Sequence, residues 1–265
     1  MQTPLTLDLG QLQQLLSALF WPFVRIGSCM MVAPVFGATA VPGRVRIVLA
    51  AATAALIAPL VPAASAVTPF SVAGCLVTGE QIVIGVALGL CLQLCFDAVS
   101  LGGQMLANSM GLSFALNVDP QRGSGSSTPA VGQLYSLLVT LTFLALNGPL
   151  RFVETLVQSF TTLPVAGTGF TAVHLEAVAR FGSTLFSGAL SVALPGITAL
   201  IVVQLAFGVM SRAAPALNLF AVGLPVSLLC GLLVVLAGLV AVQATFIHSL
   251  QNAFRMLGVL IGAPG

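Results

Sequence analysis

The sequence contains no lysine, and charged residues of all kinds make up only 5% of the chain. Soluble domains carry charge on roughly a quarter of their residues, so this composition excludes an ordinary soluble domain. The eight basic residues are all arginines, and they are spread along the chain. Nucleic-acid-binding surfaces concentrate basic side chains on one stripe, and we therefore expect no nucleic-acid partner.

Cysteine and histidine are few and do not form metal-binding or catalytic patterns. His174 and His248 have no acidic or cysteine partner at ligand spacing. All five cysteines lie in apolar surroundings: Cys29, Cys75, Cys91, Cys95 and Cys230. We interpret them as small buried hydrophobic residues, because metal and redox motifs use other spacings and add histidine. The sequence therefore predicts no catalytic residue, no metal site and no cofactor.

Apolar sequence dominates the chain. Hydrophobic residues make up 58% of it, and the mean hydropathy is +1.12. Several uncharged windows exceed the roughly 20 apolar residues that cross the hydrocarbon core of a bilayer. These windows lie between Arg46 and Glu80, between Arg122 and Arg151, between Arg180 and Arg212, and between Arg212 and Arg255. We predict an all-α, membrane-associated protein in contact with lipid.

Apolar periodicity and breaker residues divide the chain into helices. We expect helices or apolar helical runs at residues 5–31, 47–61, 72–107, 130–146, 151–163, 181–210 and 216–246, with a polar connector at 166–171. Pro195 and Pro225 lie inside the last two runs and predict kinks. A Gly85-x-x-x-Gly89 spacing predicts a close helix contact. Arg25 interrupts an apolar helix end and needs a protein partner, water or a lipid headgroup.

One helix pattern can be tested position by position. In residues 130–146, the apolar residues at helical spacing indicate a single packed face. That face comprises Val131, Leu134, Tyr135, Leu138 and Leu141.

The middle of the chain holds its one strongly polar, glycine-rich stretch. Residues 123–127 are all Gly or Ser and predict a loop. The preceding residues 111–118 are partly apolar and end at Asp119-Pro120, a pair that stops a helix. A loop that only connects two helices needs polarity, whereas a loop that fills an opening needs flexible apolar bulk.

Two interpretations of this stretch stay open from the residues alone. A closed pore needs apolar, movable groups that dewet a constriction. Met105, Met110, Leu112 and Phe114 supply such groups, and Gly111 supplies a hinge. Alternatively, Leu112 and Phe114 only pack a helix end.

Four motifs occur in order along almost the whole chain. They are Ala33-Pro34-x-Phe36-Gly37 with Pro42-x-Arg44-x-Arg46, then GLSFA at 111–115 with Val118-Asp119-Pro120, then FLALNG at 143–148, and then RAAPALNLFAVGLP at 212–225. Together they resemble the FliR family of flagellar type III export-gate proteins, whose virulence-system relatives form the SctT branch. The last motif is the most specific, and the wording of the motifs favours the flagellar branch.

The resemblance implies an export-gate subunit that conducts unfolded secreted proteins and has no catalytic activity. It implies kinked helical hairpins packed into a multi-subunit helical export-gate assembly, in the bacterial inner membrane at the flagellar basal body. The implied partners are FliP-like and FliQ-like subunits, FlhB-like and FlhA-like export components, and the unfolded secreted proteins themselves.

The resemblance also assigns roles to residues. It implies a central plug loop at residues 111–128 between an N-terminal helical half, 1–110, and a C-terminal helical half, 129–265, within one integrated membrane-complex domain. Family members often carry an aromatic residue where this chain has Asn117, so the seal would depend more on Met110, Leu112 and Phe114. They usually carry a histidine where this chain has Pro149, a difference that concerns only a helix end. The plug and gating residues are Met105, Met110, Gly111, Leu112, Ser113, Phe114, Ala115, Leu116, Asn117, Val118, Asp119 and Pro120.

Subunit contacts are expected at motif residues outside the plug. An alternative role for two of them is local, because Arg212 suits the carbonyl end of one helix and Pro215 the first turn of the next. The two roles are compatible. The contact candidates are Arg44, Arg46, Arg212, Pro215, Asn218 and Pro225.

Two other function classes compete with the export gate. A secondary transporter of a small solute would suit the prolines within the last two helices. Such transporters normally place charged groups at mid-membrane, and residues 181–210 and 216–246 contain no Asp, Glu, Lys or Arg. An intramembrane enzyme would need a nucleophile with a base, or a metal cluster, and neither histidine has that setting.

Overall fold

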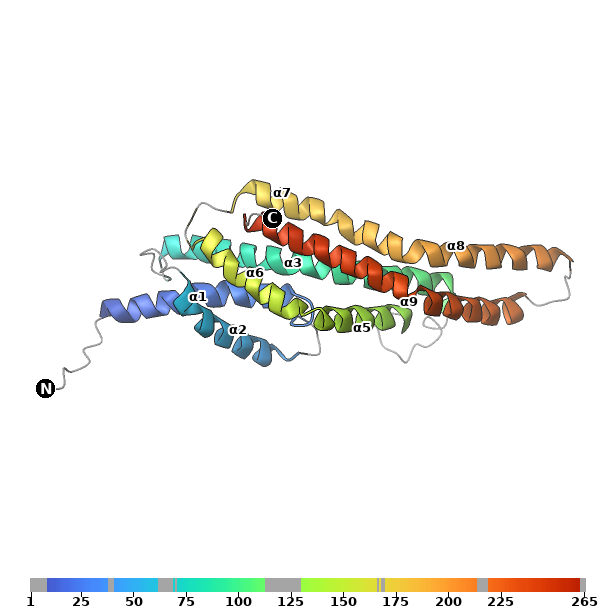
Figure 1. Ribbon diagram of the computed structural model, residues 1–265, viewed down its shortest axis with the longest axis horizontal. Coiled ribbons are helices and arrows are strands. Elements are labelled where there is room, and N and C mark those ends of the chain that lie inside the picture. Colours follow the sequence, from blue (N-terminus) through green and yellow to red (C-terminus); the bar gives the residue numbers. More distant parts are fainter. Residues whose placement is uncertain are drawn as a thin grey trace. The chain divides into compact units, whose positions relative to one another are not determined.

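The computed structural model describes residues 9–37, 41–61, 69, 71–112, 130–165, 167, 170–213 and 219–262. Within these residues the secondary structure is helical and contains no strand, which confirms the predicted all-α class. The helices are α1 (Leu9–Val32), α2 (Gly43–Ile57), the 3-10 helix η1 (Ala58–Leu60), α3 (Val72–Ser109), α5 (Ala130–Ala145), α6 (Gly148–Thr162), α7 (Ala172–Phe181), α8 (Ser183–Ala213) and α9 (Leu219–Leu260) (Figure 1).

Three of the described segments are long and apolar enough to cross a membrane. They are Val72–Ser109, Ala172–Met210 and Gly223–Leu260. Helices α5 and α6 are bent by 67° relative to each other and would make a fourth if they form one broken span. A shorter apolar helical segment lies at Ser17–Val32.

The chain divides into two compact units. Unit 1 comprises Met1–Gln93, Asn147–Phe181 and Ala253–Gly265, and unit 2 comprises Leu94–Leu146 and Gly182–Asn252. Each unit takes segments from both halves of the sequence. The predicted partition at residues 111–128 stays a prediction.

In unit 1, α1 and α3 run parallel and in close contact. Trp21 packs against Val77, and Arg25 is hydrogen-bonded to Gln81 one turn further along both helices. Farther on, Gly85 and Gly89 of α3 lie against the α1 backbone, where a Cβ on Gly89 would be 2.7 Å from the Cys29 carbonyl oxygen. The predicted Gly85-x-x-x-Gly89 contact is confirmed, because only the missing side chains allow this approach. Figure 1 shows α1 beside α3 and α6.

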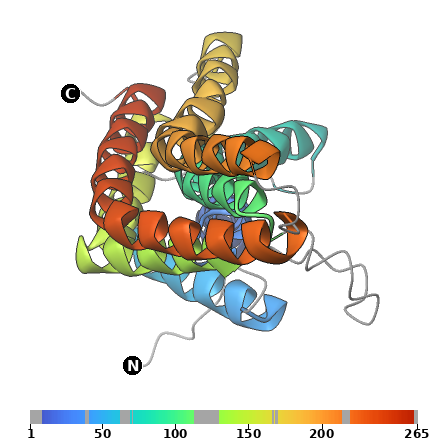
Figure 2. The same cartoon turned by 90° about the vertical axis from the view of Figure 1, so that its right-hand side faces the viewer.

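In unit 2, the second part of α3 packs against α5, α8 and α9. Phe96 contacts the rings of Phe143 in α5 and Phe246 in α9 edge-on, at centroid distances of 5.3 and 5.1 Å. Gly102 lies against Val192 of α8, where a Cβ would be 2.8 Å from the valine Cβ. In Figure 2 the end of α3 lies between α8 and α9. This part of α3 is therefore the centre of unit 2.

Two helices differ from the sequence prediction. Helix α7 was not predicted. At its N-terminus the His174 Nδ1 accepts a hydrogen bond of 3.1 Å from the Thr171 N–H, which lies just before the first turn. Helix α9 continues to Leu260 instead of ending near residue 246. The apolar run identified in the sequence ends at residue 246, but the buried residues Leu250, Ala253 and Leu257 continue the helical period.

The predicted face of α5 was partly wrong. Val131 and Tyr135 are buried as expected, but Leu134 is 43% exposed and Leu141 is 56% exposed. Val139 and Phe143 are buried in their place, because α3 contacts α5 on a face rotated from the one that hydrophobicity alone indicates. In a membrane protein, apolar side chains can also face outward, so they mark packing less reliably.

Candidate functional site

The side chain of Arg25 in α1 is completely buried and joins three helices of unit 1. Its Nε donates to Gln81 Oε1 of α3 at 2.7 Å. Its Nη1 donates to the Ser159 carbonyl oxygen and its Nη2 to the Leu163 carbonyl oxygen, each at 2.8 Å. The guanidinium also lies over the Phe160 ring, 4.3 Å from the centroid. We call these five residues the Arg25 cluster.

The electrostatics of the Arg25 cluster follow from the end of α6. The Ser159 carbonyl lies in the last turn of α6 and also accepts from the Leu163 N–H at 3.0 Å, and the Leu163 carbonyl follows directly after the helix. Carbonyls at the C-terminus of a helix carry partial negative charge, so a cation there is favourable. Burial lowers the pKa of Arg25 to about 10, and the negative charge of Glu80 opposes this shift. The guanidinium therefore stays charged at neutral pH. Arg25 lies outside the three candidate membrane spans.

The sequence predicted that Arg25 needs a partner, and the structure supplies protein groups. Two of them are backbone carbonyls, which have no sequence signature. One buried donor in the cluster, Gln81 Nε2, has no hydrogen-bond partner among the described residues, and neither has Trp21 Nε1 one turn earlier on α1.

The predicted gating residues that the structure describes lie at the end of α3 in unit 2. Met110 is 3% exposed, whereas Met105 and Leu112 are half-buried. Gly111 has φ +82, the left-handed conformation that commonly ends a helix. The remaining predicted plug residues, Ser113 to Pro120, lie outside the described part of the chain.

Helices α8 and α9 hold this end of α3. Gln204 Nε2 of α8 donates to the Ser109 carbonyl oxygen at 3.0 Å. Gly231 of α9 lies under Met110, where an added Cβ would be 2.5 Å from Met110 Cγ. We call this contact the Met110 socket. A Cβ on Gly111 would lie 2.9 Å from Leu224 Cδ2.

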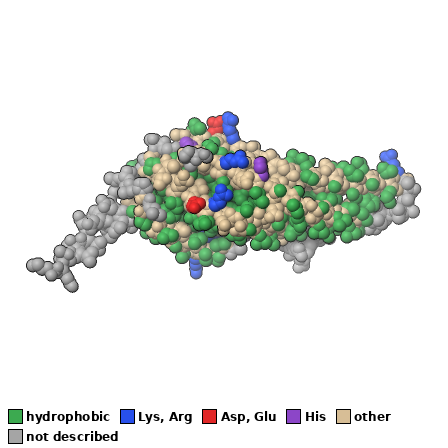
Figure 3. Space-filling view, in the orientation of Figure 1, with side chains coloured by type: hydrophobic (Ala, Val, Ile, Leu, Met, Phe, Trp, Pro, Cys, Tyr) green, Lys and Arg blue, Asp and Glu red, His purple; other side chains and the backbone are tan. Residues whose placement is uncertain are grey.

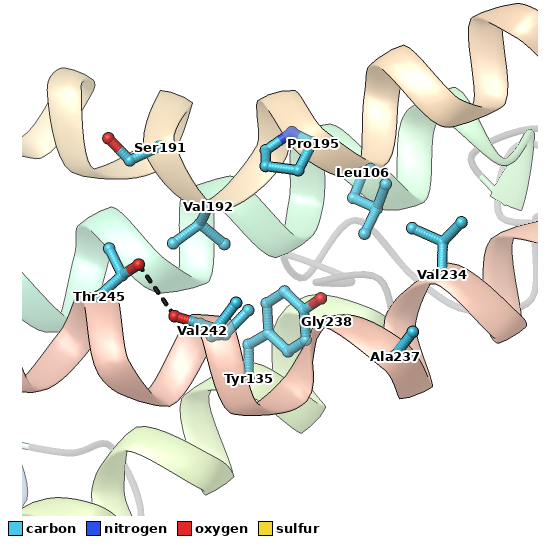
Figure 4. A pocket seen from close by; sticks show the side chains of 12 residues that line it. Leu106, Tyr135, Ser191, Val192, Pro195, Val234, Ala237, Gly238, Val242 and Thr245 are labelled. Atoms are coloured by element: carbon cyan, nitrogen blue, oxygen red, sulfur yellow. Dashed lines mark hydrogen bonds between the residues drawn. The ribbon is translucent and has the colours of Figure 1, made fainter.

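A pocket of about 280 Å³ lies between α3, α5, α8 and α9 in unit 2 (Figure 4). Pro195 and Gly196 lie within α8 beside it, and the Tyr135 ring projects between α5 and α9. The hydroxyls of Ser191 and Thr245 donate to carbonyls of their own helices, at 2.8 and 2.9 Å. Because these hydroxyls bond to their own helices, the pocket presents mainly apolar side chains. Its lining residues are Leu106, Tyr135, Ser191, Val192, Pro195, Gly196, Val234, Ala237, Gly238, Ala241, Val242 and Thr245.

The predicted subunit-contact residues are spread over three helices. Arg44 is exposed and Arg46 is half-buried, both in the first turns of α2. Arg212 is exposed in the last turn of α8, where a cation suits the helix dipole. Pro225 is exposed within α9. Pro215 and Asn218 lie outside the described residues.

Apolar side chains make up much of the accessible surface of the long helices. On the face shown in Figure 3, hydrophobic side chains are widely spread and charged ones are few. Only 22% of the most apolar window in Ala172–Met210 and 17% of that in Gly223–Leu260 is buried. Among the residues that the structure describes, no three His, Cys, Asp or Glu side chains lie together in a metal-binding group.

Comparison with known proteins gives consistent matches along almost the entire chain. Residues 16–253 match the family described as "Bacterial export proteins, family 1". The flagellar biosynthetic protein FliR of Pectobacterium carotovorum subsp. carotovorum is 36% identical over 258 residues, 97% of each chain. FliR of Escherichia coli (strain K12) is 36% identical over 247 residues, 93% of each chain. FliR of Bacillus subtilis (strain 168) is 26% identical over 250 residues, 89% of this chain and 94% of its own.

Proposed function

Because this chain belongs to the bacterial export proteins, family 1, we propose that it is a gate subunit forming part of the channel through which unfolded proteins leave the cell. It is a membrane component of the flagellar export apparatus, in line with its FliR relatives. We place it in the bacterial inner membrane, at the flagellar basal body.

The main support for this proposal is that the two long apolar segments Ala172–Met210 and Gly223–Leu260 are mostly exposed on the surface of the chain. Their most apolar windows are only 22% and 17% buried within the chain. An isolated protein rarely exposes so much contiguous apolar surface unless lipid or another subunit covers it. The proposed occupants of this surface are FliP-like and FliQ-like subunits together with lipid, and we propose FlhB-like and FlhA-like components as further contacts.

We assign the plug role to residues 111–128. The segment starts at Gly111, directly after the buried end of α3, and its first part carries Leu112 and Phe114. Apolar side chains close a pore by dewetting it, without binding the ions that they exclude. In this proposal the chain contributes no chemical step, and its work is to admit or block an extended polypeptide.

Two experiments test the proposal. Co-expression with FliP-like and FliQ-like chains should give one large complex on purification. Deletion of residues 111–123 in that complex should make cells leak ions, because the channel loses its plug. Phe114→Ala should leak less than the deletion and more than the wild type. An unchanged membrane conductance in the deletion would remove the plug assignment.

The alternative of a secondary transporter gains little from the structure. The described pocket beside Pro195 has no Asp, Glu, Lys, Arg or His among its lining residues, so it offers no charged group for ion coupling at that place. Purification of a stable monomer that transports a solute would favour this alternative over an export gate.

A further inference from the structure

One face of α3 in unit 2 carries a line of polar side chains that reach the surface. Asp97 and Asn108 are exposed, and Ser100 and Gln104 are half-buried. Spaced three or four residues apart, the four lie on one side of the helix and span about 17 Å along it. Gln104 Nε2 donates to Ser100 Oγ at 3.4 Å. Every Asp, Asn, Gln and Ser of residues 94–108 belongs to this line, which we call the polar stripe.

The other faces of this part of α3 are buried against α5, α8 and α9. A Cβ on Gly103 would lie 2.9 Å from Cδ2 of the Tyr135 ring in α5. The Phe96 ring contacts the Phe246 ring of α9, and Gly102 lies against α8. The polar stripe is therefore the side of α3 that the described helices of unit 2 leave uncovered.

Lipid does not suit the polar stripe. The stripe lies in Val72–Ser109, a candidate membrane span, where a carboxylate facing hydrocarbon would be costly. Asp97 is the one acid among the residues of unit 2 that the structure describes. Exposed side chains elsewhere in the unit, such as Phe186 and Val202 of α8 and Leu233 of α9, are apolar and suit lipid. The stripe instead requires water or polar protein groups against it.

The chemistry of the polar stripe fits a partner that changes. Amide side chains both donate and accept hydrogen bonds, as hydroxyls do, so they can pair with peptide N–H and C=O groups in any register. An extended polypeptide presents such groups all along its length, whatever its side chains are. A fixed interface that buried Asp97 would need a matched cation against it, whereas a hydrated carboxylate needs none.

We propose that the polar stripe is a wall of the export path, along which the unfolded polypeptide moves in contact with water. Gln104 and Asn108 exchange hydrogen bonds with its peptide groups, and the Asp97 carboxylate favours basic segments over acidic ones. This inference rests on the channel role proposed above. It adds the surface that the polypeptide touches and a charge preference of that surface.

Ser100→Cys in the co-expressed complex tests access to water. The substitution is nearly isosteric, and a thiol reacts as its thiolate, which forms in water and not in hydrocarbon. A charged maleimide added to the complex in lipid nanodiscs should label this variant several-fold above wild type, whose own cysteines give the background. The matched control is Ala199→Cys, at an exposed position of α8 one turn from Val202, and it should stay near the background.

The same variant tests contact with the polypeptide. An export substrate that carries one cysteine in its unfolded part, and a folded domain at its end, stalls during export. A short bismaleimide should join that cysteine to Ser100→Cys and not to Ala199→Cys. If Ser100→Cys fails to assemble, Asn108→Cys replaces it, with the same expected results.

Asp97→Asn tests the charge preference. Two matched substrates, one with a basic and one with an acidic unfolded segment, are exported by the same cells. The ratio of their export rates, basic to acidic, should fall by up to roughly fivefold, the ratio for an exposed charge pair at the top of its usual range. Glu154→Gln removes an exposed acid of α6 in unit 1, and it should leave the ratio unchanged.

The outcomes separate this inference from the proposed function. Labelling of Ser100→Cys at background in a complex that still exports, with no cross-link to the substrate, would show that a subunit or lipid covers the polar stripe, and the inference would be wrong. An unchanged rate ratio in Asp97→Asn would overturn the charge preference. Normal export by cells that lack this chain would overturn the proposed function itself.

Discussion

The Arg25 cluster of unit 1 and the Met110 socket of unit 2 fix helices by opposite means. Arg25 is charged and buried, and it donates hydrogen bonds of 2.7–2.8 Å to oxygen atoms of Gln81, Ser159 and Leu163. Met110 is apolar and is held by the shape of a glycine-floored socket. Hydrogen bonds to a charge impose direction as well as distance, whereas dispersion contacts require only close packing. The difference is between a polar junction in one unit and an apolar one in the other.

The largest effect is expected from breaking the polar junction. Arg25→Met keeps length and apolar contact but leaves the Gln81 amide oxygen and the Leu163 carbonyl without the donor that Arg25 supplies. The Ser159 carbonyl loses one of its two donors, because it also accepts from the Leu163 N–H. We expect a loss of roughly 3 kcal/mol or more in stability, because hydrogen bonds to charged groups are strong and buried acceptors are costly to leave unpaired. Thermal unfolding of the purified complex in detergent measures it.

Two related variants sharpen that result. Arg25→Lys keeps the charge but cannot reproduce the three-directional fork, so its melting temperature should fall between those of Arg25→Met and wild type. Arg180→Ala removes an arginine whose ion pair with Glu176 is exposed, and it should change stability by under about 0.5 kcal/mol. Equal melting temperatures for Arg25→Met and Arg180→Ala would contradict the role given to Arg25.

A smaller effect is expected where α3 contacts the backbone of α1. A Cβ on Gly85 would collide with the Arg25 carbonyl oxygen and the Ser28 hydroxyl. Gly85→Ala should therefore destabilise the protein by about 1–3 kcal/mol, since the backbone cannot move aside as a flexible side chain can.

Gly79→Ala provides the comparison within the same helix. Gly79 has nothing within 4 Å of its Cβ position, so alanine there should stabilise the helix by up to about 1 kcal/mol. Denaturation of the two variants side by side should give changes of opposite sign. Changes of the same sign would mean that α1 and α3 are not in close contact at Gly85.

The smallest effect is expected from a shape-conserving change in the Met110 socket. Met110→Leu keeps the volume but branches the side chain over Gly231, and such swaps usually cost under about 1.5 kcal/mol. We expect a stability close to wild type, measured by thermal unfolding of the purified complex in detergent. A loss of stability comparable to that of Arg25→Met would contradict the view that the Met110 socket tolerates a change of shape.

The sequence indicated what each region needs, but the contacts themselves depend on pairings between distant helices. Helical periodicity and the Gly85-x-x-x-Gly89 spacing predicted the all-α class and one close contact. The cost of a buried charge predicted that Arg25 has partners. Its carbonyl acceptors belong to Ser159 and Leu163, whose side-chain types give no sign of that role.

The socket was hidden for a different reason. Gly231 lies in a uniformly apolar helix, where a single glycine has many explanations, and its match to Met110 spans more than a hundred residues of sequence. The extent of α9 was misjudged because His248 and Gln251 interrupt the apolar run, although the buried positions continue to Leu260. Pattern alone therefore predicts elements and requirements better than it predicts partners.

The most direct test of the account is single-channel recording from the purified complex in planar bilayers, with and without residues 111–123. The account predicts a silent wild-type complex and sustained open channels for the deletion, at equal amounts of assembled protein. A deletion complex that assembles normally and stays silent would contradict the claim that this chain closes the export channel.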